Sequence, residues 1–134
     1  MKRIIQTLPL LLLLFISYTA IAQQTDAIPG IWKGTSLCQI KNSPCHDETV
    51  VYHISSTDTI NVYRNIGNKI VNGQEEYMGT LFFTYEPAKQ LLISVDKQRN
   101  ASWELQVKGN KMEGKLIYQG NVYRIVNVEK QNNP

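Results

Sequence analysis

The run 45–48 (Cys-His-Asp-Glu), followed by His53, is the densest group of potential metal ligands in the sequence. Zinc sites usually combine Cys and His at short, repeated spacings. If residues 49–55 form an extended strand, His46 and His53 lie too far apart along it to share an ion unless the loop folds back. We therefore predict a solvated acidic loop ahead of a strand and no metal site.

Residues for catalysis are sparse. No pairing of a nucleophile with a histidine stands out, and no G-x-S-x-G elbow occurs. With two histidines in the chain, carboxylates such as Glu48 and Glu104 would have to act as general bases. Glu75 and Glu76, beside Tyr77, are more typical of the charged start of a strand. We predict that the protein is not an enzyme and uses no cofactor.

Aromatic side chains on alternating segments are a better lead to function. Arg64 shares a predicted apolar face with Ile60 and Val62, and an apolar cavity with a few polar groups would suit an amphipathic molecule with an anionic head. The predicted ligand-binding side chains are Tyr52, Arg64, Phe83, Tyr85, Trp103 and Tyr118. The alternative is that these aromatics fill the interior completely, and the sequence does not decide between an open cup and a solid core.

Cys38 and Cys45 are the two cysteines of the chain. In an exported protein an even count favours a disulfide. The spacing is not CxxC, which favours a structural bridge over a redox or metal-binding pair. The bridge would stabilise the fold by roughly 2–3 kcal/mol through loop closure. A rigid loop also costs less to order on binding, so the alternative function is a protein-interaction or inhibitor module that uses loop 38–48 and binds its partner at residues 39–48.

The first 22 residues predict a cleaved signal peptide. A basic start is followed by an apolar run over 4–16, and Ala20 and Ala22 occupy the positions that a signal peptidase reads, so we expect cleavage before Gln23. The apolar run is shorter than the roughly 20 residues of a membrane span, and no cysteine follows it directly. We expect an exported protein, periplasmic or extracellular, without a membrane anchor.

Charge and length limit the class of partner and the number of domains. Without Lys2 and Arg3, the 14 basic residues fall to 12 against 11 acidic ones. This near balance gives no reason to expect a nucleic acid partner or an anionic membrane surface. We predict a flexible leader over 23–29 and a single domain over 30–134.

The elements that must position these residues are strands. Apolar and polar residues alternate over short segments, separated by turns rich in Gly, Asn, Pro and Asp. The predicted strands are 31–38, 49–55, 59–64, 69–71, 75–85, 91–96, 101–107, 112–118 and 121–129, with a turn at Asn65–Asn68. Alternation favours antiparallel sheet, and a meander protects its edges by closing. We therefore expect an all-β, antiparallel, up-and-down meander of 8–9 strands closed into a barrel.

Two motifs at the ends of this domain resemble the lipocalins and their calycin relatives. Gly30-x-Trp32 heads the first strand, and Arg124 lies in the last strand on a face shared with Val126 and Val128. In that family a tryptophan closes one barrel end and an arginine lies across it. The resemblance implies a structural closure formed by Gly30, Trp32 and Arg124, since a tryptophan ring can hold an arginine by stacking and cation–π contact. The alternative is that Arg124 simply reaches solvent.

The same resemblance implies a lipocalin-like cup that binds a small hydrophobic or amphipathic molecule. The chain departs from the family in being short and in lacking the C-terminal helix. The loop that contains Pro44 occupies the place of the lid helix of the fatty-acid-binding relatives, so no such lid is expected.

Overall fold

The structure is a computed structural model that describes residues 27–132. The predicted signal peptide and residues 23–26 lie outside this part of the chain. The strands are β1 (Gly30–Cys38), β2 (Glu48–Ser56), β3 (Val62–Val71), β4 (Gln74–Glu86), β5 (Leu91–Asp96), β6 (Ala101–Lys108), β7 (Lys111–Tyr118) and β8 (Asn121–Lys130). Between residues 27 and 132 there is no helix long and apolar enough to cross a membrane.

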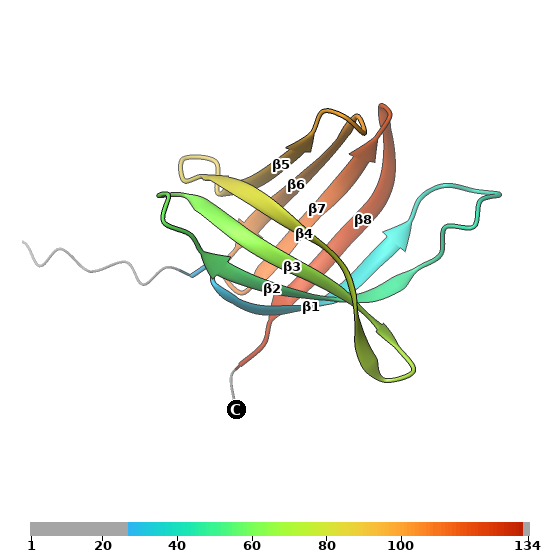
Figure 1. Cartoon of the computed structure of the whole chain (residues 1–134), viewed down its shortest axis with the longest axis horizontal. Helices are drawn as coiled ribbons and strands as arrows, with labels where there is room; N and C mark the ends of the chain where they lie inside the picture. Colours follow the sequence, from blue (N-terminus) through green and yellow to red (C-terminus); the bar gives the residue numbers. More distant parts are fainter. Residues whose placement is uncertain (1–26, 133–134) are drawn as a thin grey trace, which may run out of the picture.

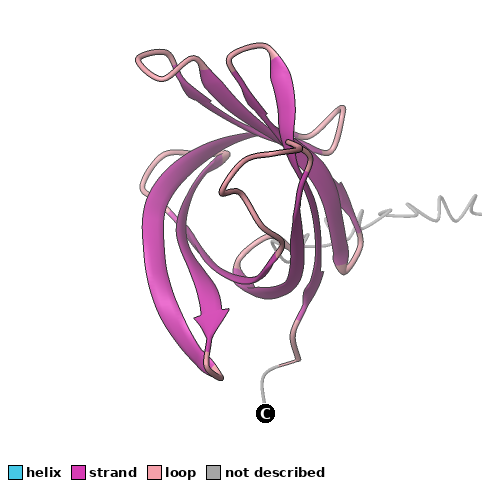
Figure 2. Ribbon diagram, turned by 90° about the vertical axis from the view of Figure 1, so that its right-hand side faces the viewer, coloured by secondary structure: helices cyan, strands magenta, loops and turns pink. Residues whose placement is uncertain are grey.

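The strands form one closed barrel in sequence order, with every neighbouring pair antiparallel and β8 returning to β1. Figure 2 shows the strands curving around a common axis, and Figure 1 shows β1–β4 and β5–β8 as its two walls. The prediction of an all-β, up-and-down meander closed into a barrel is confirmed, with eight strands. Closure leaves few free edges, which a meander of this length would otherwise expose.

The third strand differs from the prediction in its start, its continuity and its inward face. The strand predicted over 59–64 begins only at Val62, because the residues before it form a turn. In this turn Asn61 has a φ of 58°, and the Val62 amide donates to the Thr59 carbonyl at 3.2 Å. The predicted turn at 65–68 is instead the middle of β3, where the register with β4 shifts between Gly67 and Asn68. Two predicted strands therefore merge into one.

The packed core fills one end of the barrel, around Trp32, which is fully buried. Its largest fully buried apolar side chains are Trp32, Phe83, Leu92, Leu105 and Met112. Ile28 is 3% exposed and belongs to the same core, and its carbonyl accepts a 2.9 Å hydrogen bond from Trp32 Nε1. Ile28 lies within the predicted flexible leader 23–29, and the prediction is wrong at this residue, because Ile28 packs into the core beside Trp32.

Candidate functional site

A cavity of about 560 Å³ occupies the barrel end opposite Trp32. The two ends differ because β1 carries the bulky Trp32 at its start, whereas it places Gly34 and Ser36 inward further along. Apolar side chains from several strands line the cavity, among them Val50, Leu81, Phe83, Trp103 and Leu116. One end of the barrel interior is therefore packed around Trp32, and the interior beyond this core holds the cavity, called the cup below.

The wall of the cup is incomplete on one side. Among the described residues, β4 pairs with β5 only from Thr84 to Glu86, although β4 begins at Gln74. The earlier part of β4 contributes Met78 and Thr80 to the cavity lining. The cavity therefore borders a stretch of β4 that does not pair with β5.

Four of the six predicted ligand-binding residues line this cavity: Tyr52, Phe83, Trp103 and Tyr118. Tyr85 does not, because it lies at the opposite end of the barrel, beside a second hollow of about 570 Å³ that turn residues largely surround. Its ring packs edge-on against Tyr63, with 6.4 Å between the centroids.

Arg64 is exposed on the outer face of β3, so its predicted role in the cavity is wrong. The strand begins at Val62, and β3 turns Tyr63, Asn65 and Gly67 inward. Burying the Tyr63 ring removes more apolar surface from water than burying Val62 would. Ile60, which was expected to share an apolar face with Arg64, is 87% exposed in the preceding turn.

The predicted closure of Trp32 by Arg124 is also wrong. In the β1–β8 ladder Trp32 lies opposite Lys130, and Arg124 lies opposite Cys38. Six residues of extended strand separate the two positions, roughly 20 Å. Lys130 takes the expected place of the arginine, with its Nζ 5.6 Å from the centroid of the Trp32 ring.

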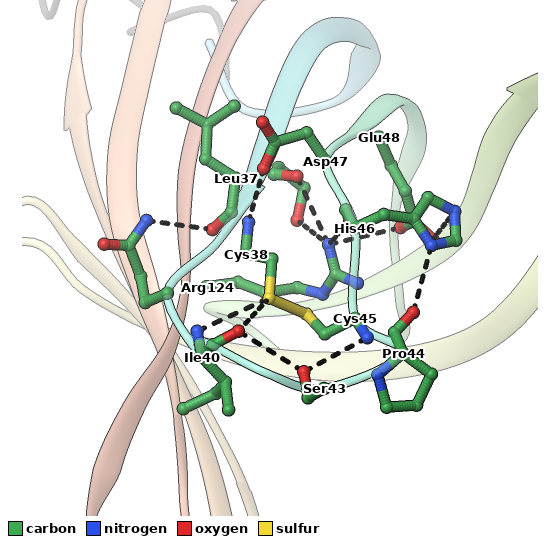
Figure 3. The surroundings of a disulfide bond; sticks show 12 residues. Leu37, Cys38, Ile40, Ser43, Pro44, Cys45, His46, Asp47, Glu48 and Arg124 are labelled. Atoms are coloured by element: carbon green, nitrogen blue, oxygen red, sulfur yellow. Dashed lines mark hydrogen bonds and ion pairs between the residues drawn. A yellow bond between two sulfur atoms is a disulfide. The ribbon is translucent and has the colours of Figure 1, made fainter.

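Arg124 instead joins three segments at the mouth of the cup (Figure 3). Its Nη1 donates to the Ser36 carbonyl at 3.2 Å, to Ser36 Oγ at 3.3 Å and to the His46 carbonyl at 3.1 Å. The same nitrogen lies 3.5 Å from Glu48 Oε2, and each of the two charged side chains is 13% exposed. Arg124 therefore holds the loop 39–47 against β1 and β2.

The loop itself is closed by a disulfide between Cys38 and Cys45, whose Cα atoms are 5.9 Å apart, so the predicted bridge is confirmed. Asp47 Oδ1 accepts a 2.9 Å hydrogen bond from the Cys38 amide (Figure 3). His53, which the sequence analysis grouped with the run 45–48 as a potential metal ligand, lies on β2. Its Nε2 is 3.1 Å from Glu75 Oε2. Within residues 27–132 no group of three or more His, Cys, Asp or Glu side chains is placed to hold a metal ion.

Tyr52 places a buried phenol beside this ion pair. Burial raises the pKa of Tyr52 above its ordinary value of 10.0; the Arg124 charge lowers it and the Glu48 charge raises it. The phenol therefore stays neutral at any physiological pH and cannot supply a negative charge to a ligand. The Tyr52 ring also covers Gly67 of the neighbouring strand.

Asn65 is a cavity residue that the sequence analysis missed. It lines the cup, the residue is 2% exposed, and its Oδ1 is buried without a hydrogen-bond donor among the described residues. An unpaired polar atom in a buried position is rare in proteins. The signal was obscured because Asn65 follows Arg64 in a segment that looked like a turn.

The fold and this site define a small antiparallel β-barrel with one packed end and one open cup. No protein-family model, no curated protein and no solved structure matches the chain.

Proposed function

We propose that this protein is an exported, lipocalin-like, non-catalytic binding protein that holds a small hydrophobic or amphipathic molecule in its cup. The observation that carries the proposal is the cavity of about 560 Å³ above a packed core. Pockets for small molecules commonly measure 300–1,000 Å³ and combine apolar walls with a few polar groups. The lining has this character, with Phe83 and Trp103 beside Glu48 and Arg124.

Two further observations support the lipocalin-like part of the proposal. A tryptophan opens the first strand at the packed end, and a cation from the last strand lies across its ring, although that cation is Lys130. The disulfide supports export to the periplasm or the outside of the cell, since disulfides persist in oxidising compartments.

The test is binding of the neutral apolar dye Nile red, together with native mass spectrometry of protein purified from its host. We expect the dye to bind and a co-purified molecule to add mass. Ala101 lines the cup, so Ala101→Trp should weaken dye binding at least tenfold. Lys115→Trp places the same ring on the outer face of β7, where Lys115 is exposed, and should change nothing. Equal binding by both variants, or none by the wild type, would refute the proposal.

A second candidate function is protein recognition by the loop 39–47. Figure 1 shows this segment extending away from the barrel between β1 and β2. The disulfide and the Arg124 hydrogen bond to the His46 carbonyl hold it in one conformation, which lowers the ordering cost of binding. Capture of one exported partner that is lost when residues 39–44 are replaced by a Gly-Ser loop would support this function. Capture that survives the replacement would remove it.

A further inference from the structure

One strand of the barrel has an edge that is paired on one side only. The ladder between β4 and β5 ends at the pair Thr84 and Ile93, and Figure 1 shows the two strands running apart from the turn that joins them. On its other side β4 pairs with β3 over its whole length. Within the described part of the chain, residues 77–83 therefore have no strand beside them on the β5 side, and we call this stretch the free edge. Unpaired backbone N–H and C=O groups on such an edge are a template for another strand.

The backbone groups of the free edge that face the gap belong to residues whose side chains point outward. Side chains and backbone groups alternate together along a strand, and the outward Thr84 is the residue that pairs across to β5. The outward residues of the free edge are Tyr77, Thr80 and Phe82, which stand opposite Asn68, Ile66 and Arg64 of β3. The register with β3 shifts between Tyr77 and Gly79, so Met78 and Gly79 together fill one step of the alternation.

The free edge lacks the features that usually protect an edge strand. Natural edges carry lysine, proline or an inward-pointing charge, whereas residues 77–83 read Tyr-Met-Gly-Thr-Leu-Phe-Phe, with no charge and no proline. The side chains beside the gap are also exposed: Tyr77 is 64% exposed, Phe82 56%, and Val95 of β5 61%. Free backbone groups and exposed apolar side chains therefore coincide at one seam, as they do at interaction sites.

This edge is complementary to itself. When a second β4 is laid antiparallel against the first, with Thr80 facing its own counterpart on a two-fold axis, Tyr77 of each copy faces Phe82 of the other. Aromatic pairs directly across a ladder are stabilising, and a two-fold axis forms each of them twice.

The charges beside the free edge fit the same arrangement. Glu75 and Glu76 precede Tyr77, whereas Arg64, exposed on the outer face, stands opposite Phe82. Antiparallel pairing therefore brings the acidic end of one copy toward Arg64 of the other. Like charges do not meet across the seam, where they would destabilise it.

We infer that two copies of this protein associate through the free edges of β4, which form one antiparallel sheet that continues from barrel to barrel. The pairing uses the outer face and the backbone of β4, so the inference is independent of what the cup holds. A second copy is favoured over an unrelated extended peptide because the aromatic and charged positions match under two-fold symmetry.

Sedimentation equilibrium of the protein over a range of concentrations tests the association. We expect a discrete dimer. Phe82→Lys places a charge at the seam and removes an aromatic anchor, and it should raise the dimer dissociation constant at least roughly tenfold. Ile125→Lys is the matched control, because Ile125 is 39% exposed but lies on β8, which is paired on both sides. A wild type that stays monomeric throughout, or equal dissociation constants for the two variants, would overturn the inference.

A cysteine at the two-fold axis tests the register. Facing positions of an antiparallel pair have Cα atoms about 4.5–5.5 Å apart, within the range of a disulfide, and the two native cysteines are already bonded to each other. Thr80→Cys should therefore form a covalent dimer on mild oxidation, seen by non-reducing electrophoresis. Arg64→Cys, exposed on the neighbouring strand, should stay monomeric. If Phe82→Lys does not fold, this cross-link tests the inference alone. No cross-link through Thr80→Cys, or equal cross-linking of both variants, would overturn it.

Discussion

Lys130 Nζ lies 5.6 Å from the centre of the Trp32 ring and donates a 2.7 Å hydrogen bond to the Ala27 carbonyl. One side chain of the last strand therefore covers the tryptophan and fixes the segment that leads into the barrel. A cation over a partly desolvated aromatic face contributes about 0.5–2 kcal/mol. The contact between Lys130 and Trp32, together with the buried Ile28 side chain, closes the packed end of the barrel.

Replacing Lys130 by methionine keeps most of the apolar stem and removes the charge and the donor. We expect Lys130→Met to lower the free energy of unfolding by about 1–2 kcal/mol, the scale of one cation–π contact and one hydrogen bond. Lys33→Met, on the exposed face of β1, should cost less than about 0.5 kcal/mol. Urea titration measures both, and equal losses would show that the Lys130 contact with Trp32 contributes nothing.

At the other end of the barrel, removing Arg124 should be costlier. Glu48 and Arg124 are each 13% exposed in their ion pair, and Arg124→Met leaves Glu48 with His46 Nε2, 4.0 Å away, as its remaining ionisable neighbour. Breaking a largely buried ion pair typically costs about 3–5 kcal/mol. We expect a loss of about 3 kcal/mol and faster tryptic cleavage after Lys41, because the loop loses its bond from Arg124 to the His46 carbonyl.

Arg99→Met is the control for Arg124→Met, since Arg99 also lines the cup but is 81% exposed. It should leave stability and cleavage at Lys41 near wild type. A double replacement, Arg124→Met with Glu48→Gln, should recover part of the stability lost in Arg124→Met, because no carboxylate is then left unpaired. No recovery would mean that the backbone carbonyl contacts of Arg124, and not its charge, set the cost.

Alternation of residue types was enough to predict the inward face of β2, where Val50, Tyr52 and Ile54 are all buried. It was not enough to predict which cation meets Trp32. Sliding β8 along β1 by an even number of residues keeps the same side chains inside, so Arg124 and Lys130 were equivalent candidates by pattern. Lys130 also lay one residue beyond the predicted end of the last strand.

The cup and its polar side chains depended on features that a sequence pattern does not carry. Whether aromatics fill a barrel depends on strand tilt and stagger, which set its width. Four of the six predicted ligand-binding residues line the cup, because alternation placed them on the inward faces of their strands. Tyr85 shares the inward face of β4 with Phe83 but lies nearer the other end of the barrel, and a residue's position along the barrel axis cannot be predicted from alternation. Arg64 was wrong because the turn before β3 ends at Asn61, which reversed the predicted inward face.

Tyr52 makes stability depend on alkaline pH. Burial raises the pKa of its phenol in the folded protein above the ordinary 10.0, so above pH 10 the unfolded chain has lost a proton that the folded chain retains. The stability contributed by the neutral phenol is thus complete below pH 10 and is lost as the pH rises toward the folded-state pKa, at about 1.4 kcal/mol per pH unit.

Urea unfolding at pH 9 and pH 11 isolates this effect. Wild type should lose roughly 1 kcal/mol more than Tyr52→Phe between the two pH values, and the shared titration of the other groups cancels in the difference. Tyr77→Phe, which removes a phenol that is 64% exposed, should follow the wild type. Parallel losses in wild type and Tyr52→Phe would contradict the burial of the Tyr52 hydroxyl.

Gly114 on β7 allows the close approach of β6 that the curved wall requires. A Cβ at this position would overlap the Glu104 carbonyl oxygen and lie 2.8 Å from Leu105 Cα, and both belong to backbone that cannot rotate away.

Gly79 on β4 is the matched control, since nothing lies within 4 Å of its Cβ position. Gly114→Ala should therefore force β6 and β7 apart and lower Tm by more than roughly 10 °C, whereas Gly79→Ala should be neutral or stabilise by about 0.5 kcal/mol through the reduced freedom of the unfolded chain. Differential scanning calorimetry of the two variants decides the point: similar Tm values would mean that the two strands can separate without cost, and the wall beside Trp103 and Leu116 would then be flexible enough for the cup to widen around a larger ligand.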